Sequence, residues 1–167
     1  MNLKSKIKND LEQVKQLIDN LDLSSVIARL VEIEKWSQKD AVLAIQQYRN
    51  YLLLKKKYPE YNLPPSKDID DVWHAHILHT KEYRTFCKQA FSHEDDQYLD
   101  HDPHLAREGT MEQLAQLFEK TQMLYYQEFG EYIFPIREGS GFTRFLDKLR
   151  DNLITRFPRL NQLVDKP

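Results

Sequence analysis

The residues most able to do chemistry in this chain are histidines and acids gathered between residues 70 and 104. Five of the six histidines form two groups, and the sixth, His93, lies between them. The groups are His74, His76 and His79, then His101 and His104. Imidazoles beside carboxylates can bind a transition metal or exchange protons near neutral pH. Any polar site is therefore expected in this part of the chain.

The first histidine group lies in a stretch with helical spacing, and this decides which side chains can meet. At about 100° per residue, Asp70 and His74 lie roughly 40° apart and one turn apart, within reach of each other. His74 and His76 lie roughly 160° apart, so they cannot bind one metal ion from a continuous helix. His76 is expected to face the core, and His79 to face water.

The face that carries His76 is predicted to pack on the core. The other residues of the motif that share it are Trp73, Thr80, Tyr83 and Cys87. On a continuous helix His76 and Cys87 would lie roughly 16 Å apart, so they are not expected to bind one ion together. A lone cysteine excludes an internal disulfide, and Cys87 is more typical of a small buried hydrophobe than of a nucleophile.

A partner for Asp70 and His74 must come from elsewhere in the chain. The segment 100–104 is the obvious source, because Pro103 restricts its backbone and helps to fix His101. Asp70, His74 and His101 could form a metal site, for which zinc is a suitable ion. They could equally form an acid–base pair in which Asp70 orients the imidazole of His74.

Each of these residues also has a purely structural interpretation. Asp70 and His74 also fit a simple helical pair worth about 0.2–0.5 kcal/mol. His76 is typical of a buried histidine with its hydrogen bonds satisfied, and His101 of a loop residue that caps a helix. The sequence favours a helical protein-interaction or scaffold module with a structural His/Asp/Trp cluster. A metal-binding or metal-dependent hydrolase-like protein is the alternative.

The apolar spacing predicts an all-α fold: a bundle of about six helices with one irregular His/Asp-rich loop. Apolar residues at alternating steps of four and three mark a first helix from Ile7 to Leu21, and residues 26–31 continue on a second. Ser37 is expected to cap a third helix that ends before Pro59. Ser66 is expected to cap a fourth helix that runs to about Ala90.

The remainder of the chain holds the irregular segment and two further helices. Residues 92–109 have no clear period. Thr110 and Gln113 form a capping box for the fifth helix, and Gly130 should end it. Residues 132–136 suggest a short extended piece, and Ser140 is expected to cap a last helix. The prediction is therefore an N-terminal extension of two helices (1–36), a helical core (37–135) and a C-terminal helix (136–167).

Composition narrows the classes of partner and compartment. With 24 basic and 26 acidic residues the net charge is -2, which gives no basic footprint for nucleic acid. No apolar run approaches the roughly 20 residues of a membrane span, and the N-terminus lacks the apolar core of a signal peptide. A cytoplasmic protein is expected, with export by another route as the alternative. The oligomeric state is left open.

Several motifs around the histidine helix resemble those of the glycine-rich-domain-containing-protein-like family, in particular its short bacterial members. The shared pattern is D-x-x-W-H-x-H-I-L-x-T-x-x-Y-x-x-x-C over residues 70–87, preceded by K-Y-P at 57–59 and P-S at 65–66. It continues with H-x-P at 101–103 and Y-Y-Q-E-F-G at 125–130. The resemblance covers about residues 37–135.

The resemblance implies which residues form the site and implies no reaction. The matching positions are Asp70, Trp73, His74, His76, Thr80, Tyr83, Cys87 and His101. The glycine-rich tail and extra domains of longer plant relatives are missing here, and Ala90-Phe91-Ser92 stands where the family usually has F-G after the cysteine. Roles that depend on those parts are therefore not expected of this chain.

Enzymatic activity is not favoured by any established motif. The chain has no H-E-x-x-H, no G-x-S-x-G and no phosphate-binding loop. Another protein is the expected kind of partner. A further hypothesis is a bacterial protein that acts on a partner or host protein through its N-terminal helices.

Overall fold

The computed structural model describes residues 3–91, 98–101 and 110–137, and within them the regular secondary structure is all helix, with no strand. The six described helices are α1 (Leu3–Asp19), α2 (Ser24–Glu32), α3 (Gln38–Lys57), α4 (Lys67–Leu78), α5 (Thr80–Ala90) and α7 (Met111–Phe129). The predicted all-α bundle of about six helices is confirmed. The last helix predicted from Ser140 lies outside the described residues. No helix in the described part of the chain is long and apolar enough to cross a membrane.

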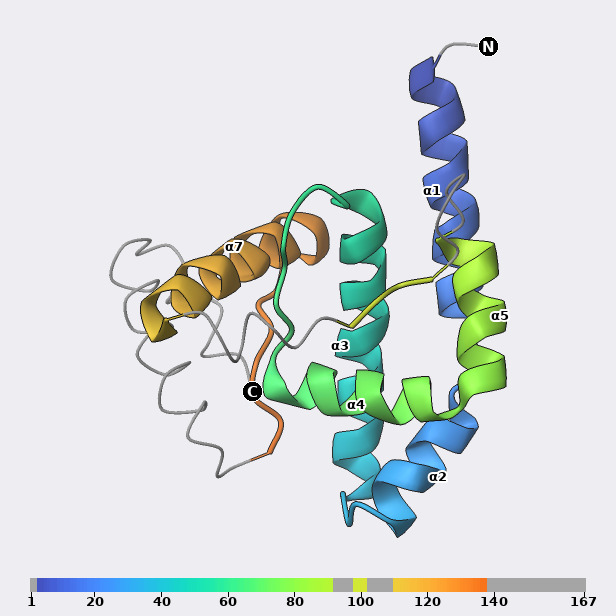
Figure 1. Ribbon diagram of the computed structural model, residues 1–167, viewed down its shortest axis with the longest axis vertical. Coiled ribbons are helices and arrows are strands. Elements are labelled where there is room, and N and C mark those ends of the chain that lie inside the picture. The colour runs from blue at the N-terminus through green and yellow to red at the C-terminus, as the bar shows by residue number, and fades with distance from the viewer. Residues whose placement is uncertain (1–2, 92–97, 102–109, 138–167) are drawn as a thin grey trace. The chain divides into compact units, whose positions relative to one another are not determined.

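Helix α3 is the central element, and α1, α2, α4 and α7 all pack on it (Figure 1). Its buried side chains recur at steps of three and four, among them Ala41, Ala44, Tyr48 and Leu52, none of which is exposed to solvent. A helix with one such apolar stripe must cover it with neighbours. The stripe of α3 therefore organises the core around which the site helices are placed.

The ends of the helices carry the capping groups that the sequence indicates. Ser37 accepts a hydrogen bond from the backbone N–H of Asp40 at 3.0 Å, as an N-cap of α3 should. Thr110 and Gln113 form both hydrogen bonds of the capping box that begins α7. Gly130 ends α7 in the left-handed region, at φ 74°. These three predicted helix ends are confirmed.

The predicted helix from Ser66 to about Ala90 is wrong in one respect, because it breaks at His79. Residue 79 has φ -84° and ψ 60°, which ends α4 and begins α5. The break sets α5 at an angle to α4 (Figure 1), so that Trp73 and Tyr83 hydrogen-bond at 2.8 Å. Ten residues apart on one straight helix, their backbones would be roughly 15 Å apart.

Two of the residue placements expected for a continuous helix are corrected by this break. Thr80 does not lie on the buried face that the wheel predicts, but is exposed as the first residue of α5. His79 does not simply face water: it is only partly exposed, and its Nε2 atom is buried without a hydrogen-bond partner among the described residues. Both differences arise because the wheel of α4 does not continue into α5.

The two N-terminal helices are packed into the same compact unit as the site. That unit spans residues 1–136, and the second unit begins at Arg137. Val14 and Ile18 of α1 are each only 2% exposed, and α1 lies beside α5 (Figure 1). The Arg49 guanidinium donates hydrogen bonds to the carbonyl groups of Ile18, Asp19 and Leu21, where α1 ends.

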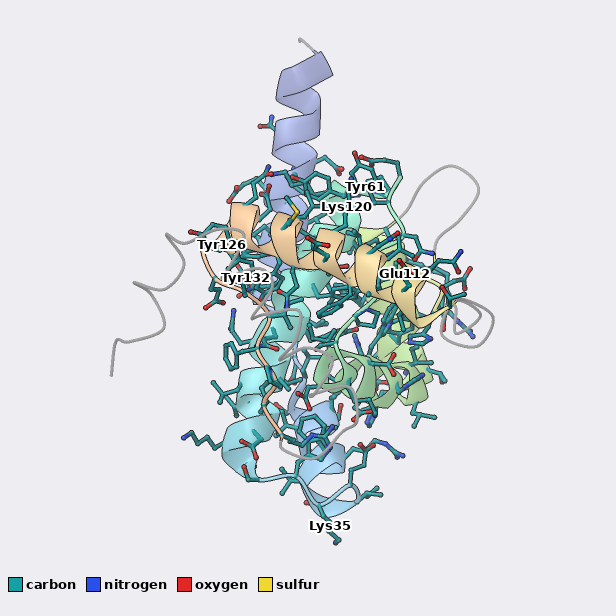
Figure 2. The ribbon with its side chains drawn as sticks, turned by 90° about the vertical axis from the view of Figure 1, so that its left-hand side faces the viewer. Lys35, Tyr61, Glu112, Lys120, Tyr126 and Tyr132 are labelled. Atoms are coloured by element: carbon teal, nitrogen blue, oxygen red, sulfur yellow. The ribbon has the colours of Figure 1, made fainter. Side chains whose placement is uncertain are left out.

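Helix α7 and the segment after it complete this unit. The side chain of Gln122 bonds both the N–H and the carbonyl of Ile133, at 2.9 and 2.8 Å. Residues 132–136 are therefore held as non-helical chain against α7, without the pairing of a strand. On the surface, Lys120 stands 3.8 Å from the ring centre of Tyr61, and the Tyr126 and Tyr132 rings stack at 4.7 Å (Figure 2).

Candidate metal centre

The first two residues of the site are placed by α4. Ser66 caps this helix by accepting a hydrogen bond from Ile69 N–H at 3.3 Å, and it is almost completely buried. Asp68, also buried, accepts a hydrogen bond from the Ile136 N–H at 2.9 Å. Both contacts anchor the first turn of α4. Asp70 and His74 follow one turn apart on its solvent-facing edge.

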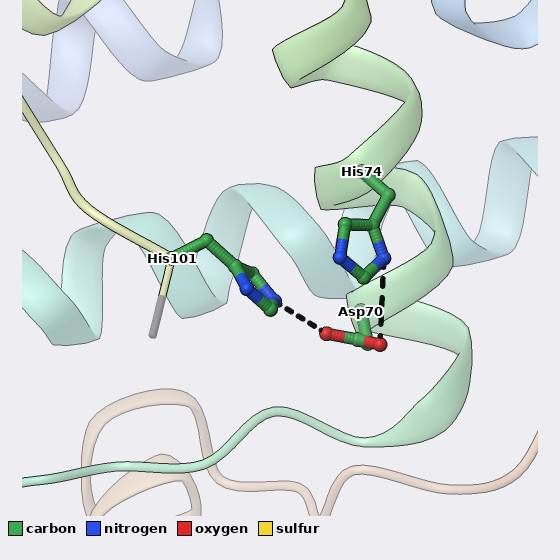
Figure 3. Close-up of side chains that lie close together, drawn as sticks. All are labelled: Asp70, His74 and His101. Carbon is green, nitrogen blue, oxygen red and sulfur yellow. Dashed lines mark hydrogen bonds and ion pairs between the residues drawn. The ribbon is translucent and has the colours of Figure 1, made fainter. Parts of the chain in front are cut away.

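The carboxylate of Asp70 lies between two imidazoles (Figure 3). Its Oδ1 atom is 2.6 Å from Nε2 of His101, and its Oδ2 atom is 3.5 Å from Nδ1 of His74. The short contact is a hydrogen bond, whereas the longer one is at the outer limit of hydrogen bonding. One carboxylate thus links a helix turn to a residue 31 positions later in the sequence.

The rings around Asp70 pack against one another. The His74 and His101 rings have their centres 4.4 Å apart, and the Trp73 ring meets His101 edge-on at 4.5 Å. The side chain of His101 is 14% exposed, that of Asp70 27% and that of His74 53%. The group is therefore covered on the Trp73 side and open to solvent on the His74 side.

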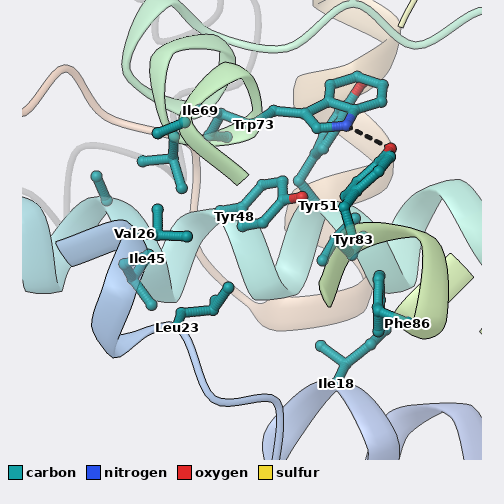
Figure 4. Close-up of a cluster of buried hydrophobic side chains, with 14 of the residues drawn as sticks. Ile18, Leu23, Val26, Ile45, Tyr48, Tyr51, Ile69, Trp73, Tyr83 and Phe86 are labelled. Carbon is teal, nitrogen blue, oxygen red and sulfur yellow. Dashed lines mark hydrogen bonds between the residues drawn. The ribbon is translucent and has the colours of Figure 1, made fainter. Parts of the chain in front are cut away.

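A buried chain of hydrogen bonds holds the segment that brings His101 to α4. The indole N–H of Trp73 donates to the hydroxyl of Tyr83 at 2.8 Å (Figure 4). That hydroxyl donates to the carbonyl of Leu99 at 2.5 Å. Burial raises the pKa of Tyr83 far above its ordinary value, so the hydroxyl keeps its proton. Leu99 stands two residues before His101.

His76 belongs to the core behind the site and does not face Asp70. It is 1% exposed, and its Nδ1 atom shares a hydrogen bond of 2.9 Å with the hydroxyl of Tyr48. The Tyr48 and Tyr83 rings both meet it edge-on, at 5.8 and 4.9 Å. Burial lowers the pKa of His76 to about 4. It is therefore a neutral histidine at physiological pH.

The remaining residues proposed from the sequence divide between the core and the surface. Cys87 is fully buried beside the Leu99 backbone and the Tyr83 hydroxyl, and burial raises the pKa of its thiol. It is therefore a thiol rather than a thiolate nucleophile. Thr80 is exposed and is not one of the three residues that converge at the carboxylate. His93 and His104 lie outside the described residues.

Sequence reasoning missed two groups that support the site. The backbone carbonyl of Leu99 cannot be recognised from the sequence, because every residue has a carbonyl and only the fold brings this one to the Tyr83 hydroxyl. Tyr48 is predictable as a residue of the buried stripe of its helix, but not as the hydrogen-bond partner of His76. Such a partner could have been found only by asking which polar atom could reach a buried imidazole from the facing helix.

Asp70, His74 and His101 offer the atoms that a transition metal uses. One ligand atom from each residue can be chosen so that all three lie within 4.8 Å of one another. In a tetrahedral site with bonds of about 2.0–2.2 Å, neighbouring ligand atoms lie roughly 3.3–3.6 Å apart. The present separations, 2.6 Å between Asp70 and His101 and up to 4.8 Å within the group, would have to adjust to that spacing when an ion binds. The set of two imidazoles and one carboxylate suits zinc or iron(II).

Comparison with known proteins gives a family for this chain. A family model described as UCP032817-like matches residues 13–124. The chain belongs to the UCP032817-like family. The match includes Asp70, His74 and His101, and also α2 and the second half of α1. Neither the comparison with curated proteins nor that with solved structures finds a match.

Proposed function

We propose that this protein binds a divalent transition metal ion, such as Zn²⁺, through Asp70, His74 and His101. The observation that carries the proposal is the convergence of two imidazoles and one carboxylate within 4.8 Å. The open side at His74, which is 53% exposed, gives an ion access from solvent. These are ligand types that zinc takes in proteins.

Three protein ligands leave a fourth position for water. Structural zinc sites are usually closed by four protein ligands, whereas catalytic sites keep a position open. Zinc lowers the pKa of bound water to about 7 and so supplies hydroxide at neutral pH. A hydrolase-like activity is therefore the reaction class that such a site would support, and Asp70 would act in it as a ligand.

The test is the zinc content and zinc affinity of protein purified without an affinity tag. Wild-type protein should bind close to one equivalent of Zn²⁺, and Asp70→Asn or His74→Ala should weaken binding by at least tenfold, because each removes a ligand. Asp71→Asn is the matched control. Asp71 is the next acid on the same helix, pairs with Lys67 and is not one of the three residues that converge. Wild-type protein that is folded and binds no zinc, iron or other transition metal would end the proposal.

A structural role for the same cluster is the second candidate. The hydrogen bond of 2.6 Å between Asp70 and His101 fastens residues 98–101 to α4. On this hypothesis the His/Asp/Trp cluster stabilises a scaffold, and His101→Ala should lower the melting temperature by several degrees without any metal present. An unchanged melting temperature in metal-free protein would count against the structural role.

Binding of another protein is supported by a groove between α1 and α5. The groove has a volume of about 760 Å³ and is lined by amide and apolar side chains, together with the charged residues Asp22, Lys81 and Glu82. Its amide residues are Gln13, Gln16, Asn20 and Gln89, and its apolar residues are Leu17, Leu21 and Phe86. Amides can donate and accept hydrogen bonds along an extended peptide, while the apolar residues receive its side chains.

A substitution in the groove tests partner binding better than removal of α1. Val14 and Ile18 are buried, so deletion of this helix would expose the core. Thr85 is exposed and lines the groove, so Thr85→Arg should fill it and abolish co-purification of a partner. Thr80→Arg, on the same helix and outside the groove lining, is the control. Equal capture by both variants would exclude this groove.

We also propose that this protein shares its site with the short bacterial glycine-rich-domain-containing-protein-like proteins that it resembles. The proposal is supported by where the motif residues lie, since Trp73, His74 and Tyr83 all surround or hold the Asp70 group. Transfer of the D-x-x-W-H-x-H-I-L segment of such a protein into this chain should leave zinc binding intact. Loss of binding in a folded chimaera would argue that the two sites differ.

A further inference from the structure

One buried tyrosine links the hydrophobic core to the segment that carries His101. The hydroxyl of Tyr83 accepts a hydrogen bond from the indole N–H of Trp73 and donates its own proton to the carbonyl of Leu99. An indole N–H is only a donor and a carbonyl is only an acceptor, so the direction of both bonds is fixed. The hydroxyl has a single proton and uses it on Leu99.

Trp73 contributes to this arrangement twice. Its N–H fixes the Tyr83 hydroxyl, and the edge of its ring meets His101 at 4.5 Å between ring centres. Trp73 also lies on α4 between Asp70 and His74, and only 3% of it is exposed. The Trp73 side chain therefore both packs against the His101 ring and holds the Tyr83 hydroxyl that binds the Leu99 carbonyl.

We infer that Tyr83 is a positioning residue for the metal site: its hydroxyl anchors Leu99 so that His101 meets Asp70 and His74 as a ligand. The inference rests on the proposed metal binding. Nε2 of His101 and Oδ1 of Asp70 are 2.6 Å apart, closer than two ligands of one ion. On binding they must separate by roughly 1 Å. With Leu99 held, only residues 100 and 101 need to adjust.

The cost of losing this anchor should appear in metal affinity. Without the Tyr83 hydroxyl, the carbonyl of Leu99 and the N–H of Trp73 both lose a partner. Residues 98–101 then keep the contact of the Cys87 thiol with the Leu99 backbone and the packing of Tyr98 on the ring of residue 83, but lose the stronger hydroxyl bond to α5. The ion must then supply more of the ordering of His101. Groups that orient ligands in this way typically change metal affinity by about 10–100-fold when removed. The hydroxyl makes no contact with the ion, so the number of ligands should not change.

The experiment compares Tyr83→Phe with wild-type protein, using Zn²⁺ and Co²⁺ as probes. Zinc affinity is measured by competition with a chelating indicator. The absorption of bound Co²⁺ reports the coordination geometry, which a loss of fold stability alone would not alter. We expect Tyr83→Phe to bind Zn²⁺ about 10–100-fold more weakly, with a changed Co²⁺ spectrum.

Tyr125→Phe is the matched control. Tyr125 is also fully buried and its hydroxyl accepts one hydrogen bond, from Asn50 at 2.9 Å, on α7 rather than at the site. This variant should lose stability and keep wild-type zinc affinity and Co²⁺ absorption. If Tyr83→Phe does not fold, Trp73→Phe removes the indole N–H while keeping an aromatic ring, and it should give a smaller loss of affinity in the same direction.

The outcomes separate this inference from the proposal on which it rests. Wild-type protein that binds no Zn²⁺ overturns both. Wild-type protein that binds Zn²⁺, together with a Tyr83→Phe variant of equal affinity and unchanged Co²⁺ spectrum, leaves the metal site standing and overturns the positioning role. The positioning role is also overturned if Tyr83→Phe and Tyr125→Phe lower the affinity equally.

Discussion

His76 shows how strongly one buried residue depends on its surroundings. It lies among aromatic rings, and its Nδ1 atom bonds to the Tyr48 hydroxyl, while its Nε2 atom has no hydrogen-bond partner among the described residues. Burial is the main reason that its pKa falls from 6.5 to about 4, with smaller contributions from the nearby charges of His79 and Arg49. A protonated His76 would have no acid to pair with among these contacts.

We predict that His76 makes the fold less stable below pH 6.5. Between pH 6.5 and pH 4, His76 is protonated in the unfolded chain but stays neutral in the folded chain. The free energy of unfolding therefore falls as the pH falls. The loss begins near pH 6.5, is complete near pH 4 and amounts to about 3 kcal/mol. Urea unfolding of wild-type protein and of His76→Asn, at pH 7 and pH 4.5, measures this contribution.

The comparison of the two proteins removes the effect of other titrating groups. His76→Asn keeps a polar atom near the Tyr48 hydroxyl and cannot gain the proton, so it should be less stable at pH 7 but lose less stability on acidification. A nuclear magnetic resonance titration should place the pKa of His76 well below 6.5. Parallel pH dependences of the two proteins would contradict the prediction.

At the candidate site, the pairing of Asp70 with His74 is predictable from the sequence, whereas the approach of His101 is not. Asp70 and His74 are one helical turn apart, and helix geometry alone brings them together. The approach of His101 depends on the path of the chain after α5 and on the Tyr83 bond to the Leu99 carbonyl. No spacing rule contains that bond, because it forms only when the break at His79 has set α5 at an angle to α4.

At the scale of elements, the break at His79 is the feature that periodicity does not reveal. Residues 66–90 contain neither glycine nor proline, so no strong breaking signal is present. His79 and Thr80 are only weak helix formers, which is a small penalty that tertiary packing can exceed. Turning the chain here buries Tyr83 and lets its hydroxyl satisfy the buried indole N–H of Trp73. Long-range packing therefore decides the break.

Arg49 is predicted to attach α1 to the rest of the fold. Its guanidinium donates to the carbonyl groups of Ile18, Asp19 and Leu21 at the end of α1, where helical partners run out, although the Ile18 carbonyl also accepts a bond from the Leu21 N–H. Burial lowers the pKa of Arg49 from its ordinary value, yet the group remains charged at physiological pH. Arg49→Met should lower the free energy of unfolding by about 1.5–3 kcal/mol.

Hydrogen exchange can show that this loss is local to one helix. Amides of α1 should exchange faster in Arg49→Met than in wild-type protein, while those of α3 change only with global stability. Lys15→Met, which removes an exposed pair with Asp19 on α1 and leaves the carbonyl contacts, is the control. Equal protection of α1 in all three proteins would show that Arg49 does not hold it.

Gly130 is predicted to be needed for the turn that follows α7. Its φ of 74° lies in the left-handed region, where a Cβ atom is disfavoured even though this one would meet nothing within 4 Å. Gly130→Ala should therefore cost about 1 kcal/mol through backbone strain alone. Gly130→Asn should cost less, because asparagine tolerates this region better. Thermal unfolding of the three proteins checks the order, and equal stability of all three would contradict it.

At the scale of the whole molecule, the proposed metal site joins two parts of the compact unit formed by residues 1–136. Asp70 and His74 belong to α4, which packs on α3, and His101 belongs to the segment that follows α5. Asp70 and His101 are 31 positions apart along the chain, so only folding brings them together. An ion held by α4 and by His101 would therefore bind the folded chain and not the unfolded one. Metal binding should therefore appear as stability.

The size of this effect follows from mass action. At a free Zn²⁺ concentration of about 100 times the dissociation constant, the folded state gains about 2.7 kcal/mol. For a chain of 167 residues this corresponds to a rise in melting temperature of roughly 5–10 °C. The rise should continue with the logarithm of the Zn²⁺ concentration, and a chelator should reverse it.

Two variants distinguish this linkage from a general effect of zinc on the protein. Asp70→Asn removes a ligand and should abolish the shift, whereas Asp71→Asn leaves the three ligands in place and should keep it. Asp70→Asn should also be less stable than wild-type protein in the absence of metal, because the bond to His101 then loses its charge. A shift of equal size in both variants would mean that zinc stabilises the chain elsewhere, since only one of them changes the Asp70, His74 and His101 group.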